Sequence, residues 1–160
     1  MAALYGLADN VSPKLLQKPI TTGNPPKLLS GGGGLFSTAS DYLRFAQMLL
    51  NKGELNGNRI LGSKTVQFMS KNHLSNELEP IHPGLPGKCF GLGFAILIDD
   101  PQSYSIGSKG EFEWRGINNT FFLVAPKEEL VLILMTQFSP YLYYPINKEF
   151  KVLVYQAIIG

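Results

Sequence analysis

Several residue patterns are scarce or absent in this chain of 160 residues. The single cysteine, Cys89, excludes an intrachain disulfide and disfavours a thiolate metal cluster. The only two histidines, His73 and His82, do not occur in a spacing that is typical of zinc ligands. The longest apolar run, 130–135, is much too short to span a bilayer, and no signal peptide is visible after Met1. We therefore expect no metal, no cofactor and no membrane span.

Strong charge of one sign is also lacking. The chain has 14 basic and 12 acidic residues, a net charge of +2 and no block of Lys or Arg, so we expect no nucleic-acid partner. Its apolar content of 44% and charged content of 16% are typical of a globular protein, and its length favours one domain, 1–160, over two. The compartment stays open: bacterial cytoplasm, or periplasm if a signal lies upstream of Met1.

The first half of the chain contains the strongest helix pattern. The spacing of apolar residues predicts a helix over 37–51, with Thr38 as N-cap and Gly53 as the stop. Its apolar face would hold Ala39, Tyr42, Leu43, Ala46, Leu49 and Leu50. The Asn56-Gly57 pair predicts a hairpin, and Ser63 is expected to cap a second helix that ends near residue 72. Residues 1–6 are interpreted as the end of a helix, and 9–29 as an irregular segment with four prolines.

The second half reads as strands followed by a helix. We expect strands over 90–98, 111–115, 120–125 and 129–136, with Leu134 in the core, and a helix over 147–159. The predicted buried face of this helix holds Phe150, Leu153, Val154 and Ala157. Glu111 and Glu113 alternate with aromatic residues and are expected on a solvated strand face. The predicted fold class is α+β, an antiparallel sheet with flanking helices.

Three segments carry a resemblance to a known family. They are SGGGGLFSTASDYLRFAQMLLNKGEL (30–55), FGLGFAI (90–96) and GEFEWRGINNTFFLVAPKEELVLILMTQ (110–137). Together they resemble the C-terminal part of β-lactamase-like serine hydrolases, of the class C β-lactamase and family VIII carboxylesterase type, which are related to penicillin-binding proteins. The resemblance implies the C-terminal portion of the β-lactamase/transpeptidase-like fold.

The resemblance also implies a site. Trp114, Arg115 and Gly116 match the Trp-x-Gly motif of the family VIII esterases, which lies on a strand beside the nucleophile and contacts substrate. The backbone N–H of Ile117 would be one oxyanion-hole donor, because acyl transfer places negative charge on a carbonyl oxygen. From spacing alone, the favoured interpretation of the triplet is an aromatic strand residue followed by a turn glycine.

The nucleophile motif of that family is missing. No serine in the chain has lysine three residues later, and no tyrosine has asparagine two residues later. We therefore expect the C-terminal region of a serine hydrolase that cleaves small esters or β-lactam-like amides, inactive in isolation because the N-terminal part with the nucleophile is absent. The alternative is a non-catalytic binding or assembly module with the same fold. Either way, an isolated C-terminal region is expected to self-associate or exchange strands.

Overall fold

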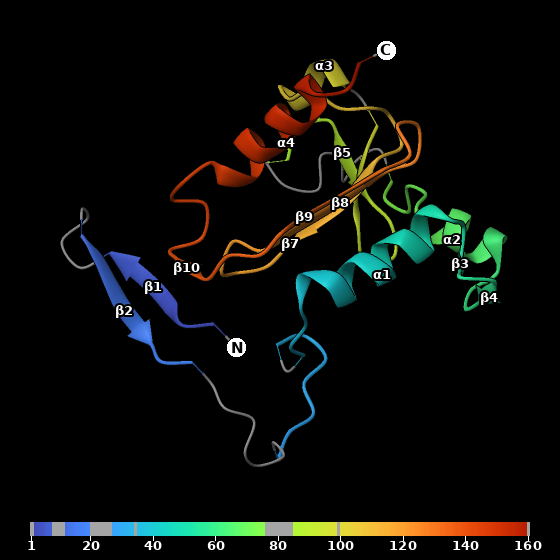
Figure 1. Ribbon diagram of the computed structural model, residues 1–160. Coiled ribbons are helices and arrows are strands. Elements are labelled where there is room, and N and C mark those ends of the chain that lie inside the picture. Colours follow the sequence, from blue (N-terminus) through green and yellow to red (C-terminus); the bar gives the residue numbers. More distant parts are fainter. Residues whose placement is uncertain are drawn as a thin grey trace.

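The computed structural model describes residues 2–7, 12–19, 27–33, 35–75, 85–98 and 100–159. Five strands in sequence order form an antiparallel sheet: β5 (Lys88–Phe90), β6 (Ala95–Leu97), β7 (Phe112–Arg115), β8 (Phe121–Ala125) and β9 (Leu130–Leu134). Helix α1 (Ala39–Leu50) and helix α4 (Ile146–Gln156) lie on opposite sides of this sheet (Figure 1). The predicted α+β class is confirmed.

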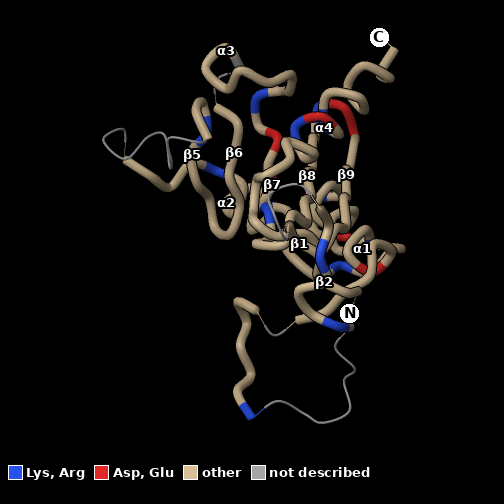
Figure 2. The backbone as a smooth tube through the Cα atoms, turned by 90° about the vertical axis from the view of Figure 1, so that its left-hand side faces the viewer, with Lys and Arg blue, Asp and Glu red and all other residues tan. Residues whose placement is uncertain are grey.

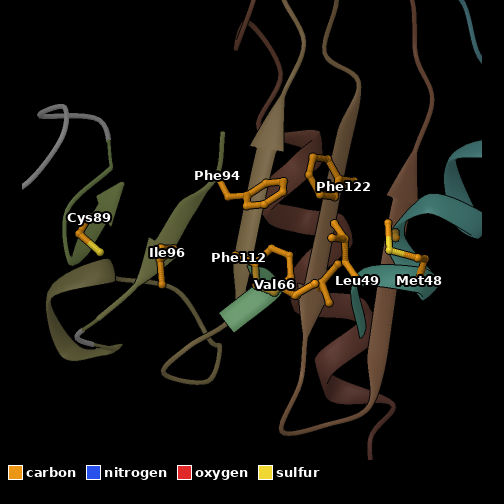
Figure 3. Packing of buried hydrophobic residues seen from close by; sticks show 10 residues of the cluster. Met48, Leu49, Val66, Cys89, Phe94, Ile96, Phe112 and Phe122 are labelled. Carbon is orange, nitrogen blue, oxygen red and sulfur yellow. The ribbon is translucent and has the colours of Figure 1, made fainter. Parts of the chain in front are cut away.

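Successive side chains of β8 (Phe121–Ala125) point to opposite faces of the sheet, so the apolar core has two layers. Phe122 and Val124 pack with residues of α1 and of the short helix α2 (Ser63–Met69), whereas Phe121, Leu123 and Ala125 face α4. Figure 3 shows the first layer, in which the rings of Phe94, Phe112 and Phe122 lie near the helix residues Leu49 and Val66. The sheet is therefore covered on both faces, as the apolar sequences of β8 and β9 predict.

The helix signals near the start of α1 are confirmed. The Thr38 hydroxyl accepts a hydrogen bond from the Asp41 backbone N–H at 3.2 Å, which satisfies one of the free donors of the first turn. Gly53 has a φ of 98° after the helix, and the Asn56-Gly57 turn joins β3 (Glu54–Leu55) to β4 (Asn58–Arg59). Leu43, however, is exposed, and Met48 takes a buried position that was not predicted.

Four predicted elements need correction at the N-terminus and in the middle of the chain. Residues 1–6 do not end a helix, because Leu4–Leu7 form strand β1, which pairs in parallel with β10 (Phe138–Ser139). Strand β2 (Pro13–Gln17) lies within the segment expected to be irregular. The N-cap of α2 is Gly62 rather than Ser63, and the helix ends at Met69 rather than near residue 72. The expected strand 90–98 is two strands, β5 and β6, because the chain reverses over 91–94.

The prediction for α4 was wrong about its buried face. Leu153 is 66% exposed and Ala157 is exposed, while Asn147, Lys151 and Tyr155 are buried. Phe150 and Val154 do pack against the core layer at their half-buried positions. The polar face turns inward because it meets buried carboxylates of the sheet. Asp100–Ser103 form the remaining short helix, α3. None of the described helices has the length and apolar content that crossing a membrane requires.

Candidate functional site

A cleft opens where β7 ends and β8 begins, on the side of the sheet that α1 covers. A cavity of about 180 Å³ lies there, and its wall includes residues of α1, of β8 and of the segment just after β9 besides those of β7. Its lining residues are Tyr42, Trp114, Arg115, Gly116, Thr120, Phe121, Phe122 and Met135. A second cavity of about 430 Å³ shares Thr120 and Met135 with the first and continues toward the start of α1. The structure thus places Trp114, Arg115 and Gly116 together at one cleft.

Trp114 offers an apolar surface to this cleft. Its side chain is 41% exposed, which is high for an indole on an interior strand, and its ring meets Phe90 edge-on at 5.0 Å between centroids. It pairs with Phe122 across β7 and β8. Because the indole is held on one side by Phe90 and open on another, it can contact a bound apolar group.

A tight turn follows Trp114 and ends the β7 strand. The Gly116 N–H donates to the Thr120 carbonyl at 2.9 Å, and the Asn119 N–H donates to the Gly116 carbonyl at 3.0 Å. A Cβ atom at Gly116 would overlap the Thr120 hydroxyl, so a side chain at Gly116 fits only if that hydroxyl moves. Ile117, at the tip, is 79% exposed, and its N–H has no hydrogen-bond partner among the described residues.

Arg115 lines the cleft, but its guanidinium is bound on the other face of the sheet. It donates to Glu113 Oε1 at 2.8 Å, and Lys88 approaches Glu113 Oε2 at 2.7 Å. Glu113 is only 2% exposed, so the expectation of a solvated carboxylate was wrong. Its strand is interior, and Lys88 on β5 covers it.

The pKa shifts follow from this geometry. Burial alone would raise the pKa of Glu113, but the charges of Lys88 and Arg115 outweigh it and hold the pKa below its ordinary value. Burial lowers the pKa of Lys88, and the Glu113 carboxylate offsets part of that shift. A lowered pKa disfavours the charged form of Lys88 but favours the charged form of Glu113, so the two shifts affect the ion pair in opposite directions. The short contact and the second cation at Glu113 favour the ionised pair.

Glu111 was also expected to be solvated and is 1% exposed. Its carboxylate contacts the Lys151 ammonium and accepts a hydrogen bond from the Tyr155 hydroxyl at 2.6 Å, both from α4. The alternation of Glu111 and Glu113 does place both carboxylates on one face, as expected. That face is covered by α4. Lys151 and Tyr155 are four residues apart, and this spacing in the sequence could have indicated a polar helix face that meets the carboxylates.

His73, one of the two histidines, is not among the residues that line the cleft. Its ring nitrogen Nε2 lies 2.8 Å from the Phe68 carbonyl oxygen. His82 lies outside the described residues. Within the parts of the chain that the structure describes, no three His, Cys, Asp or Glu side chains gather as metal ligands would. Tyr42 and Met135 are cleft residues that sequence reasoning missed, because they lie far from the motif in sequence.

The structure thus has an antiparallel sheet flanked by helices, with a Trp-x-Gly strand end at a cleft, as the resemblance implies. The chain belongs to the beta-lactamase family, whose sequence model, described as Beta-lactamase, matches residues 2–154. The resemblance read from the three sequence segments is thereby confirmed.

Two proteins of Mycobacterium tuberculosis are related in sequence: protein Rv1367c of strain H37Rv and protein MT1414 of strain CDC 1551. Each is 36% identical to this chain over 149 residues, a match that covers 87% of this chain and 36% of the relative. The chain therefore spans about a third of the length of these curated relatives.

Solved structures share the fold. A mutant of simvastatin synthase from Aspergillus terreus superposes with a TM-score of 0.77 at 22% identity, covering 97% of this chain and 42% of that one. EstCE1, a hydrolase with promiscuous acyltransferase activity, has a TM-score of 0.67 at 18% identity, with coverages of 99% and 43%. A beta-lactamase from Mycobacterium bovis has a TM-score of 0.54 at 20% identity, with coverages of 76% and 43%. These likenesses confirm the β-lactamase/transpeptidase-like fold.

Proposed function

We propose that this chain is the C-terminal region of a serine hydrolase that cleaves small esters through an acyl-enzyme. The observation that carries the proposal is the end of β7, where Trp114 and Gly116 line one cleft. Ile117 follows Gly116 directly, and its N–H has no hydrogen-bond partner among the described residues. In acyl transfer, a serine oxygen adds to a carbonyl carbon and the carbonyl oxygen becomes negative. A fixed N–H donor stabilises that oxygen more in the transition state than in the substrate.

The nucleophile would come from outside these residues. No serine here has lysine three residues on, and the chain spans only about a third of its curated relatives. In the proposed longer protein, the missing part supplies the serine and its lysine, and this chain supplies the cleft wall and one oxyanion donor. The isolated chain is then inactive, because a donor without a nucleophile forms no acyl-enzyme.

The cleft favours esters over β-lactams. β-Lactam substrates carry a carboxylate, which a cationic side chain recognises best. Trp114 offers no charge, and the guanidinium of Arg115 is already engaged by Glu113 at 2.8 Å. An apolar acyl or alcohol group packed on the indole is the better match for this surface.

The isolated chain is also proposed to self-associate. Leu15 and Leu16 on β2 are half exposed, and Leu28, Leu29 and Leu35 beyond it are largely exposed. Strand β9 pairs with β8 on one side, and its other edge has no partner strand among the described residues. Exposed apolar residues and open strand edges promote association between copies. Light scattering that shows a monomer over a wide concentration range would contradict this.

The test is a turnover assay with short-chain p-nitrophenyl esters. The samples are this chain, the longer protein, and the longer protein with Trp114→Ala or Trp114→Phe. We expect no turnover above background from the chain alone, and a loss of about tenfold or more for Trp114→Ala, corresponding to at least about 1.4 kcal/mol of lost contact. The Phe variant keeps an aromatic wall and should retain most of the rate. A longer protein inert to every ester and β-lactam tried would favour the non-catalytic module.

A further inference from the structure

A third cavity, lined mostly by polar residues, lies on the α4 side of the sheet. It has a volume of about 350 Å³ and is formed by the region around β5, the loop after α3, β7 and the first two turns of α4. The residues that matter for its chemistry are Lys88, Glu113, Arg115, Asn147, Lys148 and Lys151. Arg115 and Phe121 line both this cavity and the ester cleft, but Lys88, Asn147 and Lys151 line only this one.

Asn147 is the unusual residue of this cavity. It is 4% exposed, and neither its Nδ2 nor its Oδ1 has a hydrogen-bond partner among the described residues. A buried amide without partners is destabilising, and such groups in native proteins call for an explanation. Because Asn147 lines the cavity, its donor and its acceptor are both available to a molecule inside it.

The charges around the cavity favour an anion. Lys88, Arg115 and Lys151 are three cations, and the two carboxylates that they contact, Glu111 and Glu113, leave one positive charge in excess. Figure 2 marks the basic positions of β5 and α4 in blue. Lys148 adds a further exposed cation at the wall. An ammonium has three protons, so Lys88 and Lys151 can each donate to a second acceptor besides their carboxylate.

The buried groups leave one positive charge in excess, and the charge of the exposed Lys148 is screened by solvent, so the cavity matches a monoanion better than a phosphate dianion. The cavity is much larger than the roughly 30 Å³ that one water occupies in the liquid, so a molecule of several heavy atoms fits. A hydrogen-bond donor on that molecule would satisfy the Asn147 Oδ1 atom. A carboxylate and a hydroxyl on the same small molecule satisfy both requirements.

We propose that this cavity binds a small hydroxy-monocarboxylate. Its carboxylate accepts hydrogen bonds from Lys88 or Lys151, and its hydroxyl bonds the amide of Asn147. The site goes beyond the proposed ester cleavage, and binding rather than turnover tests it.

The experiment is isothermal titration of the longer protein with three matched probes: lactate, propionate and lactamide. Lactate should bind saturably in the millimolar range, propionate about tenfold more weakly for want of the hydroxyl, and lactamide not measurably for want of the charge. Inorganic phosphate serves as a fourth probe and should bind more weakly than lactate. No saturable lactate binding up to about 50 mM, or equal binding of all four probes, would overturn the proposal.

The variant is Asn147→Leu, which removes the unpaired amide without leaving another polar group buried, and should fold at least as well as the wild type. Its lactate affinity should fall about tenfold, while Asn58→Leu, at an exposed position on β4, should bind as the wild type. Asn147→Asp is a second variant of the same shape, whose carboxylate should repel the ligand. If either Asn147 variant folds and binds lactate like the wild type, the assignment is wrong.

Discussion

Replacing Glu113 by glutamine removes the carboxylate that two cations share. Lys88 approaches one carboxylate oxygen at 2.7 Å and Arg115 the other at 2.8 Å, and the Lys88 side chain is only 8% exposed. Glutamine has nearly the same shape, so Glu113→Gln changes the charge and leaves the packing. The variant therefore isolates what the carboxylate contributes at this position.

The expected loss in the free energy of unfolding is about 3 kcal/mol. This is the lower end of the range for leaving one member of a buried ion pair without its partner. The lower end applies because Arg115 is 21% exposed and can turn toward solvent. Burial also lowers the pKa of Lys88, so its ammonium can lose a proton more readily than an exposed one. Adding Lys88→Met to Glu113→Gln removes the stranded charge and should restore most of the loss.

Urea unfolding at pH 7 measures the effect. The matched control is Glu54→Gln, since Glu54 pairs with Arg59 at 2.6 Å on the exposed β3–β4 hairpin. An exposed pair contributes under about 1 kcal/mol, so the control should change little. If Glu113→Gln loses no more stability than Glu54→Gln, or if the Lys88→Met addition makes it worse, the buried-pair reasoning is refuted.

Three further results are expected. Gly116→Ala should destabilise the protein by about 1–3 kcal/mol and lower ester turnover, because the new methyl group meets the Thr120 hydroxyl; Thr120→Ala in the same molecule should relieve both effects, and a harmless Gly116→Ala would contradict the account. Leu132→Ala should cost about 2–5 kcal/mol and Leu134→Ala less, because Leu132 is buried and Leu134 half-buried; equal losses in urea unfolding would contradict this. The folded-state pKa of Glu113 is held below its ordinary value of 4.5, so the stability from this carboxylate is present above that pH and is lost as the pH falls through the folded-state pKa. The difference in the free energy of unfolding between wild type and Glu113→Gln should therefore shrink as the pH falls below 4.5, and a difference that does not change with pH would contradict the assignment.

Local signals predicted the elements that local interactions determine. The Thr38 cap, the Gly53 stop and the Asn56-Gly57 turn each depend on residues within a few positions, and the structure confirms them. Strand β1 was mistaken for a helix because its identity depends on pairing with β2, which lies in a segment read as irregular, and with β10, more than 130 residues away in the chain. Sequence periodicity carries no information about such a partner.

The site was predicted in part for the same reason. Trp114, Arg115 and Gly116 are adjacent and their motif is readable, whereas Tyr42 and Met135 reach the cleft only through the fold. The buried charges were misread because apolar periodicity weighs lysine and glutamate as surface residues. Here charged residues on α4, β5 and β7 neutralise one another, which a single segment cannot reveal.

The central claim is that an acyl-enzyme forms on a serine outside these residues, with this chain as the cleft wall. The most direct measurement is the intact mass of each protein after brief incubation with a short-chain p-nitrophenyl ester and an acid quench. The account predicts one acyl adduct on the longer protein, none on this chain alone, and none on the longer protein when the serine of its Ser-x-x-Lys motif is changed to alanine. An acyl adduct on a serine of this isolated chain would contradict the account.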